Sequence, residues 1–238
     1  MIIREATPDR TRLTVLLTVY RKYRMNRTIF FLLTILFLLT GCAPSEENTK
    51  RRPIDHEVSV DAGEYTGRGS VFLTEEDAAV IVTARHLIAD AEEKGMEEFK
   101  VTFSDHTEAS AKILLIDEES DLCFIVVPRG EGKALSDSVA FPEEEKTLKE
   151  EDLVFLYDGK GEKHSGYLTA LKTDAAGVGR DLMSFACSVK EGMSGCGIYN
   201  ANGEYVGMLI AGDDEENALG VPADRIRDIY KQERRDEE

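Results

Sequence analysis

Residues 78–86 read Ala78-Ala79-Val80-Ile81-Val82-Thr83-Ala84-Arg85-His86, a short apolar run that ends at a histidine. Its first six residues are rich in β-branched side chains, which is typical of a buried strand. Similar runs recur from Val58 onward, with turn signals about every eight to twelve residues, and this pattern predicts an all-β sandwich or barrel. The other candidate strands are residues 70–73, 99–103, 109–116 and 122–127, and in a second set residues 153–157, 166–172, 182–187, 197–199, 205–211 and 218–221.

Two further segments organise the chain. Residues 129–151 lie between the two sets of strands and are rich in Gly, Ser and Glu, so we interpret them as a connection between two half-domains. After the last strand, Pro222 opens a segment with apolar residues at helical spacing, which predicts a C-terminal helix over 222–234. Residues 90–98 also favour a short helix.

The charge of the chain argues against one class of partner. The 238 residues include 29 basic and 46 acidic side chains, a net charge of -17. Residues 1–41 are basic, so the remainder is more acidic than this total indicates. An acidic body repels phosphate backbones, and we expect no nucleic-acid partner. A hydrophobic content of 42% is enough for a packed core.

The N-terminus has the pattern of a targeting segment. Basic residues precede the apolar run 29–39, which is shorter than the roughly 20 residues of a membrane-spanning helix and fits a secretory signal. Leu39-Thr40-Gly41-Cys42 resembles a bacterial lipobox, which implies a lipid (palmitate) on Cys42 and a membrane-anchored lipoprotein of the cell envelope, outside the cytoplasm. The alternatives are an ordinary signal peptide or an uncleaved anchor. If Met25 is the true start, residues 1–24 are an upstream extension.

Residues 42–57 are polar and include two prolines, which predicts a flexible tether to the domain at 58–232. The cysteines beyond Cys42 are Cys123, Cys187 and Cys196, and an odd number cannot form a complete disulfide framework. Cys123 and Cys187 lie in apolar runs, where cysteine behaves as a small hydrophobic residue. Because no CxxC pair occurs, we expect no metal site.

Three short motifs carry candidate chemistry. His86 ends a strand, Asp121 precedes the apolar run 122–127, and Ser194 lies in the loop Gly192-Met193-Ser194-Gly195-Cys196. Each motif alone is weak evidence, because such residues are common in turns and on surfaces. Together they offer a hydroxyl, a base to activate it and a carboxylate to orient the base, which nucleophilic catalysis requires.

The order His, Asp, Ser resembles the trypsin/chymotrypsin-like serine protease family, and is closest to the bacterial HtrA/Deg-type protease domain. The resemblance covers about residues 58–232 and rests on these motifs: Gly67-Arg68-Gly69-Ser70-Val71-Phe72, Val82-Thr83-Ala84-Arg85-His86, Asp121-Leu122-Cys123, Gly192-Met193-Ser194-Gly195-Cys196, Asn202-Gly203-Glu204-Tyr205-Val206-Gly207-Met208 and Leu219-Gly220-Val221-Pro222.

The resemblance implies a chymotrypsin-like fold of two six-stranded β-barrels, over about 58–130 and 150–221, with a short C-terminal helix. The active site would lie in the seam between the barrels. It also implies a role for each motif. Ser194 would be the nucleophile, His86 the general base and Asp121 the residue that orients the imidazole, and the N–H groups of Gly192 and Ser194 would form the oxyanion hole.

For the substrate, the resemblance implies binding by Ser188 and Gly212. Ser188 would lie at the base of the primary specificity pocket, where a neutral hydroxyl favours a small or uncharged side chain. The partner would be a protein or peptide substrate, and the triad chemistry requires no cofactor.

The chain departs from the family pattern in the nucleophile loop. Met193 stands where the family usually has Asp or Asn, and Cys196 and Gly197 replace the usual second Gly and Pro. Three hypotheses follow. The first is a lipid-anchored serine endopeptidase that acts through an acyl-enzyme, and the second is a catalytically inactive lipoprotein that binds peptides. The third is a different β architecture in which the motifs are coincidental.

Other polar residues have simpler interpretations. We expect His56, His106 and His164 to be solvated loop residues, and Asp117 to belong to a turn. Ser184 lies in a strand rather than in a glycine-flanked loop. The acidic runs at 75–77, 117–119, 143–145 and 213–216 are typical of solvated faces, and the alternative is that they steer basic peptides toward the cleft.

Overall fold

The computed structural model of the protein describes residues 52–128, 138–142, 148–213 and 215–236. The predicted signal run, the lipobox with Cys42, and parts of the predicted tether and of the connection at 129–151 lie outside these residues. Among the residues that are described, no helix has the length and apolar character needed to cross a membrane.

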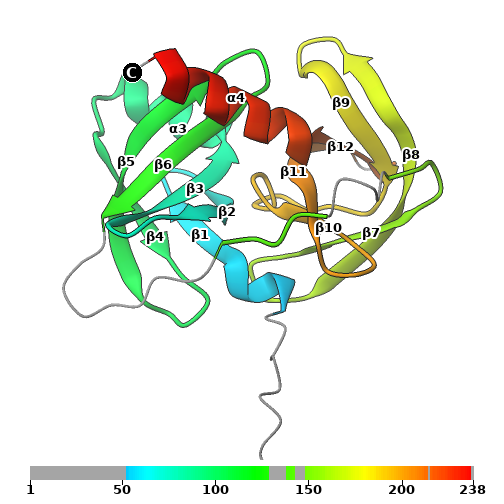
Figure 1. The fold of residues 1–238 in the computed structure, drawn as a ribbon, viewed down its shortest axis with the longest axis horizontal. Coiled ribbons are helices and arrows are strands. Elements are labelled where there is room, and N and C mark those ends of the chain that lie inside the picture. Colours follow the sequence, from blue (N-terminus) through cyan, green and yellow to red (C-terminus); the bar gives the residue numbers. More distant parts are fainter. Residues whose placement is uncertain (1–51, 129–137, 143–147, 214, 237–238) are drawn as a thin grey trace, which may run out of the picture. The chain divides into compact units, whose positions relative to one another are not determined.

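Some strands, such as Glu98–Thr102, alternate buried and exposed side chains, whereas others, such as Ala78–Ala84 and Tyr205–Gly212, are buried along most of their length. The strands pair in two separate sets (Figure 1). The first set is β1 (Glu57–Asp61), β2 (Thr66–Thr74), β3 (Ala78–Ala84), β4 (Glu98–Thr102), β5 (Glu108–Asp117) and β6 (Leu122–Pro128). The second is β7 (Leu153–Tyr157), β8 (Lys163–Ala175), β9 (Gly179–Ala186), β10 (Gly197–Asn200), β11 (Tyr205–Gly212) and β12 (Asn217–Pro222).

Each set closes on itself into an antiparallel barrel. The strand order is β1-β2-β3-β6-β5-β4 in barrel 1 and β10-β11-β12-β9-β8-β7 in barrel 2. Helix α4 (Ala223–Asp236) follows the last strand and packs on β11, β12 and β5. The predicted fold class, two six-stranded barrels with a C-terminal helix, is therefore confirmed, and the hypothesis of a different β architecture is wrong.

Three apolar clusters form the interior. One fills barrel 1 and one fills barrel 2. The third is shared, because it includes Phe72 and Phe124 of barrel 1, Tyr199 of barrel 2 and Tyr230 of α4. The Tyr230 ring lies 5.5 Å from the Phe72 ring and 5.3 Å from the Phe124 ring, measured between centroids. The two barrels and the helix thus bury one another's aromatic surface.

One local prediction was displaced along the chain. The helix expected over 90–98 is α3 (Arg85–Glu93), which begins directly after β3 and contains His86 in its first turn. Leu87, Ile88 and Ala91 are buried and hold one face of α3 against barrel 1. Gly95, with φ of 79°, follows the end of the helix, where a left-handed residue commonly stops it.

The chain enters barrel 1 earlier than the expected start at residue 58. A 3-10 helix, η1, covers Pro53–His56, and β1 starts at Glu57. His56 is 7% exposed and Glu57 is 1% exposed, so both side chains lie inside the fold.

Candidate active site

His86 and Asp121 are brought together by the register of two neighbouring strands. Ala84, at the end of β3, pairs with Leu122, at the start of β6. The residues just beyond this pair therefore face each other, and the Arg85 N–H donates to the Asp121 carbonyl at 2.9 Å. The His86 backbone N–H donates to Asp121 Oδ1 at 2.9 Å, and His86 Nδ1 lies 2.6 Å from Asp121 Oδ2.

The backbone of Asp121 is unusual. Its φ of 56° is in the left-handed region, which aspartate tolerates better than most residues and which is common at functional sites. The neighbouring Ser120 is fully buried, and its hydroxyl accepts a hydrogen bond from Arg225 Nε of α4 at 3.0 Å. The Arg225 contact at Ser120 and the His86 backbone N–H at Oδ1 thus help to hold the Asp121 carboxylate toward the imidazole.

The Asp121 carboxylate sets the electrostatics of His86. It raises the pKa of His86 above 6.5, mainly through the hydrogen bond to the ring, and burial offsets part of this effect. A neutral His86 that donates from Nδ1 to a carboxylate carries its lone pair on Nε2. Because the His86 side chain is 48% exposed and Nε2 has no hydrogen-bond partner among the described residues, this nitrogen can accept a proton from another group.

Ser194 lies in a loop that two glycines shape. Gly192 and Gly195 have φ of 83° and 87°, a conformation that glycine adopts without strain. A Cβ atom on Gly195 would stand 1.9 Å from the Arg68 carbonyl oxygen, so no other residue fits there. The Arg68 N–H donates to the Ser194 carbonyl at 2.8 Å. The loop of barrel 2 is therefore bound to β2 of barrel 1.

The loop also meets the helix that carries His86. A Cβ atom built on Gly67 would lie 2.7 Å from Leu87 Cδ2 and 3.0 Å from the Ser194 carbonyl oxygen. Leu87 directly follows His86 in α3, so the serine loop abuts the first turn of this helix. The His86 ring and the Ser194 hydroxyl form no hydrogen bond with each other in this structure, and such contacts often tighten only when substrate is bound.

Two backbone N–H groups in the loop are unpaired. The N–H groups of Met193, Gly195 and Cys196 donate to carbonyls, whereas those of Gly192 and Ser194 donate to no acceptor among the described residues. The Met193 side chain is 1% exposed and packs in the core of barrel 2, which accounts for an apolar residue at this position. The Gly192 and Ser194 N–H groups are thus available to an external anion.

The predicted substrate-binding residues lie at the ends of two strands of barrel 2. Ser188 follows β9 and is exposed, and Gly212 ends β11. A Cβ atom on Gly212 would stand 2.0 Å from Cγ2 of Val189, the residue after Ser188. Val189 therefore fills the space beside Gly212, and only a glycine can approach it this closely.

Two of the competing histidines differ from expectation. His106 lies in the exposed turn between β4 and β5, as predicted, but His56 and His164 are not solvated. The His164 side chain is 9% exposed, because its ring packs between Asp158 and the Ser188 carbonyl, 3.1 Å from Nδ1. The sequence around these two residues is polar, so it gave no sign of their burial.

The other competing groups behave as expected. Asp117 Oδ2 accepts from the Ser120 N–H at 3.0 Å, which is turn chemistry, and the Ser184 hydroxyl lies in β9, 2.8 Å from Thr169 Oγ1. Cys123 and Cys187 are buried, and burial raises the pKa of their thiols to about 12 and about 11. Both are therefore protonated small hydrophobic residues rather than nucleophiles.

Asp158, Glu162 and His164 are the one group in the described part of the chain whose side chains could share a metal ion, with ligand atoms within 4.8 Å of one another. Their contacts are explained without an ion. Asp158 Oδ1 accepts from the N–H groups of Lys160 and Glu162, and Glu162 faces Lys190 Nζ at 3.5 Å.

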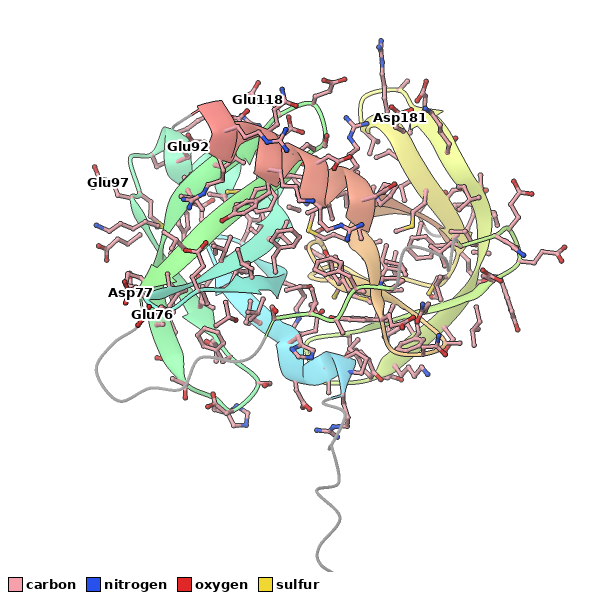
Figure 2. The ribbon with its side chains drawn as sticks, viewed as in Figure 1. Glu76, Asp77, Glu92, Glu97, Glu118 and Asp181 are labelled. Atoms are coloured by element: carbon pink, nitrogen blue, oxygen red, sulfur yellow. The ribbon has the colours of Figure 1, made fainter. Side chains whose placement is uncertain are left out.

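Acidic side chains are distributed over the outside of the molecule (Figure 2). Glu76, Asp77, Glu92, Glu97, Glu118 and Asp181 come from both barrels and point away from the ribbon. The described residues of the runs at 75–77 and 213–216 are exposed, as the interpretation of solvated faces requires; the run at 143–145 lies outside the described residues.

Two charged residues beside the site are not predicted from the sequence. Glu57 and Arg68 are 1% and 9% exposed and lie where barrel 1 meets the serine loop. Glu57 falls in the expected tether and Arg68 in a glycine-rich motif, so the local sequence gives no sign that either is buried.

Comparisons with known proteins agree with this fold. The model of a trypsin-like peptidase domain matches residues 69–208, more than half of the chain. A comparison with functionally characterised proteins finds no significant match.

Solved structures share the architecture. Rv3671c from M. tuberculosis H37Rv, in an inactive mutant form, is 19% identical with a TM-score of 0.58, over 76% of this chain and 87% of that one. Deg5 is 20% identical with a TM-score of 0.59, over 76% of this chain and 92% of that one. With the family model, these likenesses confirm the resemblance stated from the motifs. The chain belongs to the trypsin-like peptidase family.

Proposed function

We propose that the protein is a serine endopeptidase that uses Ser194, His86 and Asp121 as a catalytic triad. The observation that carries this proposal is the 2.6 Å contact between His86 Nδ1 and Asp121 Oδ2, beside the loop that presents Ser194 between two left-handed glycines. A contact through Nδ1 leaves Nε2 as the base, which is the tautomer that the triad requires.

The reaction follows from these positions. Ser194 Oγ attacks the substrate carbonyl carbon, and its proton passes to His86 Nε2. The carbonyl oxygen gains the negative charge and accepts hydrogen bonds from the N–H groups of Gly192 and Ser194. The C–N bond then breaks, and His86 returns the proton to the leaving amine. Water attacks the acyl-enzyme through the same base and releases the acid, with Asp121 stabilising the imidazolium in both halves.

The substrate class is a peptide with a small, uncharged side chain before the scissile bond. Ser188 offers a neutral hydroxyl, and Val189 occupies the space beside Gly212, so the pocket favours a short apolar group over a long basic one. The exposed carboxylates add a field that attracts basic segments elsewhere in the substrate.

Peptidyl phosphonate probes test both parts of the proposal. We expect a probe whose phosphonate replaces the carbonyl of a valine or alanine residue to phosphonylate the protein. The adduct should lie on the tryptic peptide that contains Ser194. The rate should be at least about 10-fold higher than for matched lysine or glutamate probes, since excluding a poorly fitting side chain is worth about 1–3 kcal/mol. Mass spectrometry of the labelled peptide makes the measurement.

Heat-unfolded protein is the control, because an unfolded serine has no base beside it and should not react. A folded protein that never labels would contradict the proposal and favour an inactive peptide-binding module. Equal rates for valine and lysine probes would contradict only the substrate class.

We also propose that the enzyme is anchored outside the cytoplasm by a lipid on Cys42. The support is the lipobox-like sequence behind a basic, apolar signal. A clickable palmitate analogue should label the wild type and not Cys42→Ser, and this variant should move from the membrane to the soluble fraction. Unchanged label and fractionation in Cys42→Ser would reject this anchor.

A further inference from the structure

Glu57 is a buried carboxylate surrounded by hydrogen-bond donors. It is 1% exposed, and its Oε1 accepts from the Ser70 hydroxyl at 3.0 Å, the Gly197 N–H at 3.1 Å and the Tyr199 hydroxyl at 2.5 Å. Its Oε2 lies 3.3 Å from the same Gly197 nitrogen. Burial raises the pKa of Glu57 above its ordinary value, and the nearby charge of Arg68 and these hydrogen bonds offset part of that effect.

These contacts cross the seam between the barrels. Glu57 and Ser70 belong to β1 and β2, whereas Gly197 and Tyr199 belong to β10, which starts three residues after Ser194. Together with the bond from Arg68 N–H to the Ser194 carbonyl, barrel 1 holds the nucleophile loop at its middle and just beyond its C-terminal end.

The same contacts explain a departure from the family pattern. The family usually has proline at the position of Gly197, and proline has no N–H to donate. Here a Cβ atom on residue 197 would lie 2.5 Å from Glu57 Oε1 and 2.7 Å from the Tyr199 hydroxyl. Only glycine leaves room for the carboxylate and also offers it an N–H group.

We propose that Glu57 is a positioning residue for the nucleophile loop, which it fixes against barrel 1 by binding the Gly197 N–H and the Tyr199 hydroxyl. The proposal rests on the proposed function, since the loop matters because it carries Ser194 and the N–H groups of Gly192 and Ser194. An apolar side chain would cost less to bury than a carboxylate, so a role in packing alone does not account for Glu57.

Two substitutions of similar volume separate this role from simple packing. Glu57→Gln and Glu57→Met both remove the ionisable group that lies near Arg68. Only glutamine can place an oxygen where Oε1 now accepts all three donors. We expect Glu57→Met to lower kcat by about 100-fold with KM changed by less than about threefold, because small displacements of reacting groups have effects of this size. Glu57→Gln should stay within about fivefold of the wild type.

Tyrosine variants extend the test if Glu57→Met fails to fold. Tyr199→Phe removes one donor from Glu57 and should lower kcat about 10-fold, which corresponds to the net loss of about one hydrogen bond. Tyr205→Phe is its matched control, because Tyr205 is equally buried, lies next to Tyr199 and makes no hydrogen bond to Glu57. Equal effects of the two tyrosine variants, or a Gln variant as impaired as the Met variant, would overturn the proposal.

Amide hydrogen exchange gives a readout that does not depend on activity. Residues 192–197 should exchange faster in Glu57→Met, or in Tyr199→Phe, than in the wild type and in Glu57→Gln. Unchanged exchange in the folded variants would reject the positioning role. A wild type that never reacts with phosphonates would instead reject the proposed function, and the exchange result would still decide the role of Glu57.

Discussion

Ser194→Ala is expected to lower kcat for peptide hydrolysis by about 10⁶-fold, the size of effect that loss of a serine nucleophile has elsewhere. The reason is that alanine offers no oxygen to attack the carbonyl carbon, while His86 and Asp121 keep their contact. Turnover of a fluorogenic peptide with an uncharged side chain before the cleaved bond measures the loss. The melting temperature should change by little, because the Ser194 side chain makes no hydrogen bond in the described structure.

Ser184→Ala is the matched control for this variant. Ser184 lies in β9 and pairs with Thr169, away from the glycine-flanked loop, so its removal should leave turnover within about twofold of the wild type. Turnover that survives in folded Ser194→Ala would show that another residue is the nucleophile and would reject the triad.

Asp121→Asn should lower kcat by roughly 10⁴-fold at neutral pH. The amide nitrogen of asparagine cannot accept the proton of His86 Nδ1. Either the imidazole takes the other tautomer, with its proton on Nε2, or it loses the partner that stabilises its cation. Steady-state kinetics with the same peptide measure the effect, and circular dichroism checks that the variant is folded.

The pH profile gives this prediction a second signature. Asp121 raises the pKa of His86 above its ordinary value of 6.5, so the imidazole stays protonated to higher pH. We expect kcat/KM of the wild type to rise with pH through an inflection above 6.5. The same raised pKa stabilises the folded protein. This contribution to the free energy of unfolding is fully present at pH below 6.5 and is lost as the pH rises through the folded-state pKa of His86. In Asp121→Asn the inflection should move to lower pH, because the largest cause of the shift is gone.

Asp117→Asn separates the catalytic role from the turn. Asp117 accepts from the Ser120 N–H, and asparagine can do the same, so the rate and the inflection should both stay near those of the wild type. An Asp117→Asn enzyme as slow as Asp121→Asn would contradict the assignment of Asp121.

The sequence was most informative where local pattern and chemistry coincide. The apolar strand β3 ends two residues before His86 and β6 begins directly after Asp121, and the two strands pair in register, so their flanking residues had to meet. The glycines around Ser194 marked a backbone that other residues cannot adopt. By contrast, Glu57 lies in a polar segment, and only the closure of barrel 1 on the serine loop buries it. A contact between residues 140 positions apart leaves no trace in local periodicity.

Element boundaries were harder to predict for a similar reason. The apolar residues Leu87, Ile88 and Ala91 follow closely after β3. Only their packing on barrel 1 distinguishes a helix here from a further strand. The charged neighbours of His164 predict a solvated side chain, yet the β7–β8 hairpin folds it against the Ser188 carbonyl.

The aromatic cluster shared by both barrels and α4 has a consequence for dissecting the chain. Tyr230 covers Phe72 and Phe124 of barrel 1, although it is reached only after barrel 2 is complete. A fragment that stops at Pro222 would therefore uncover the side of two phenylalanines of the opposite half that Tyr230 covers, so the shared cluster is complete only when the last helix is present.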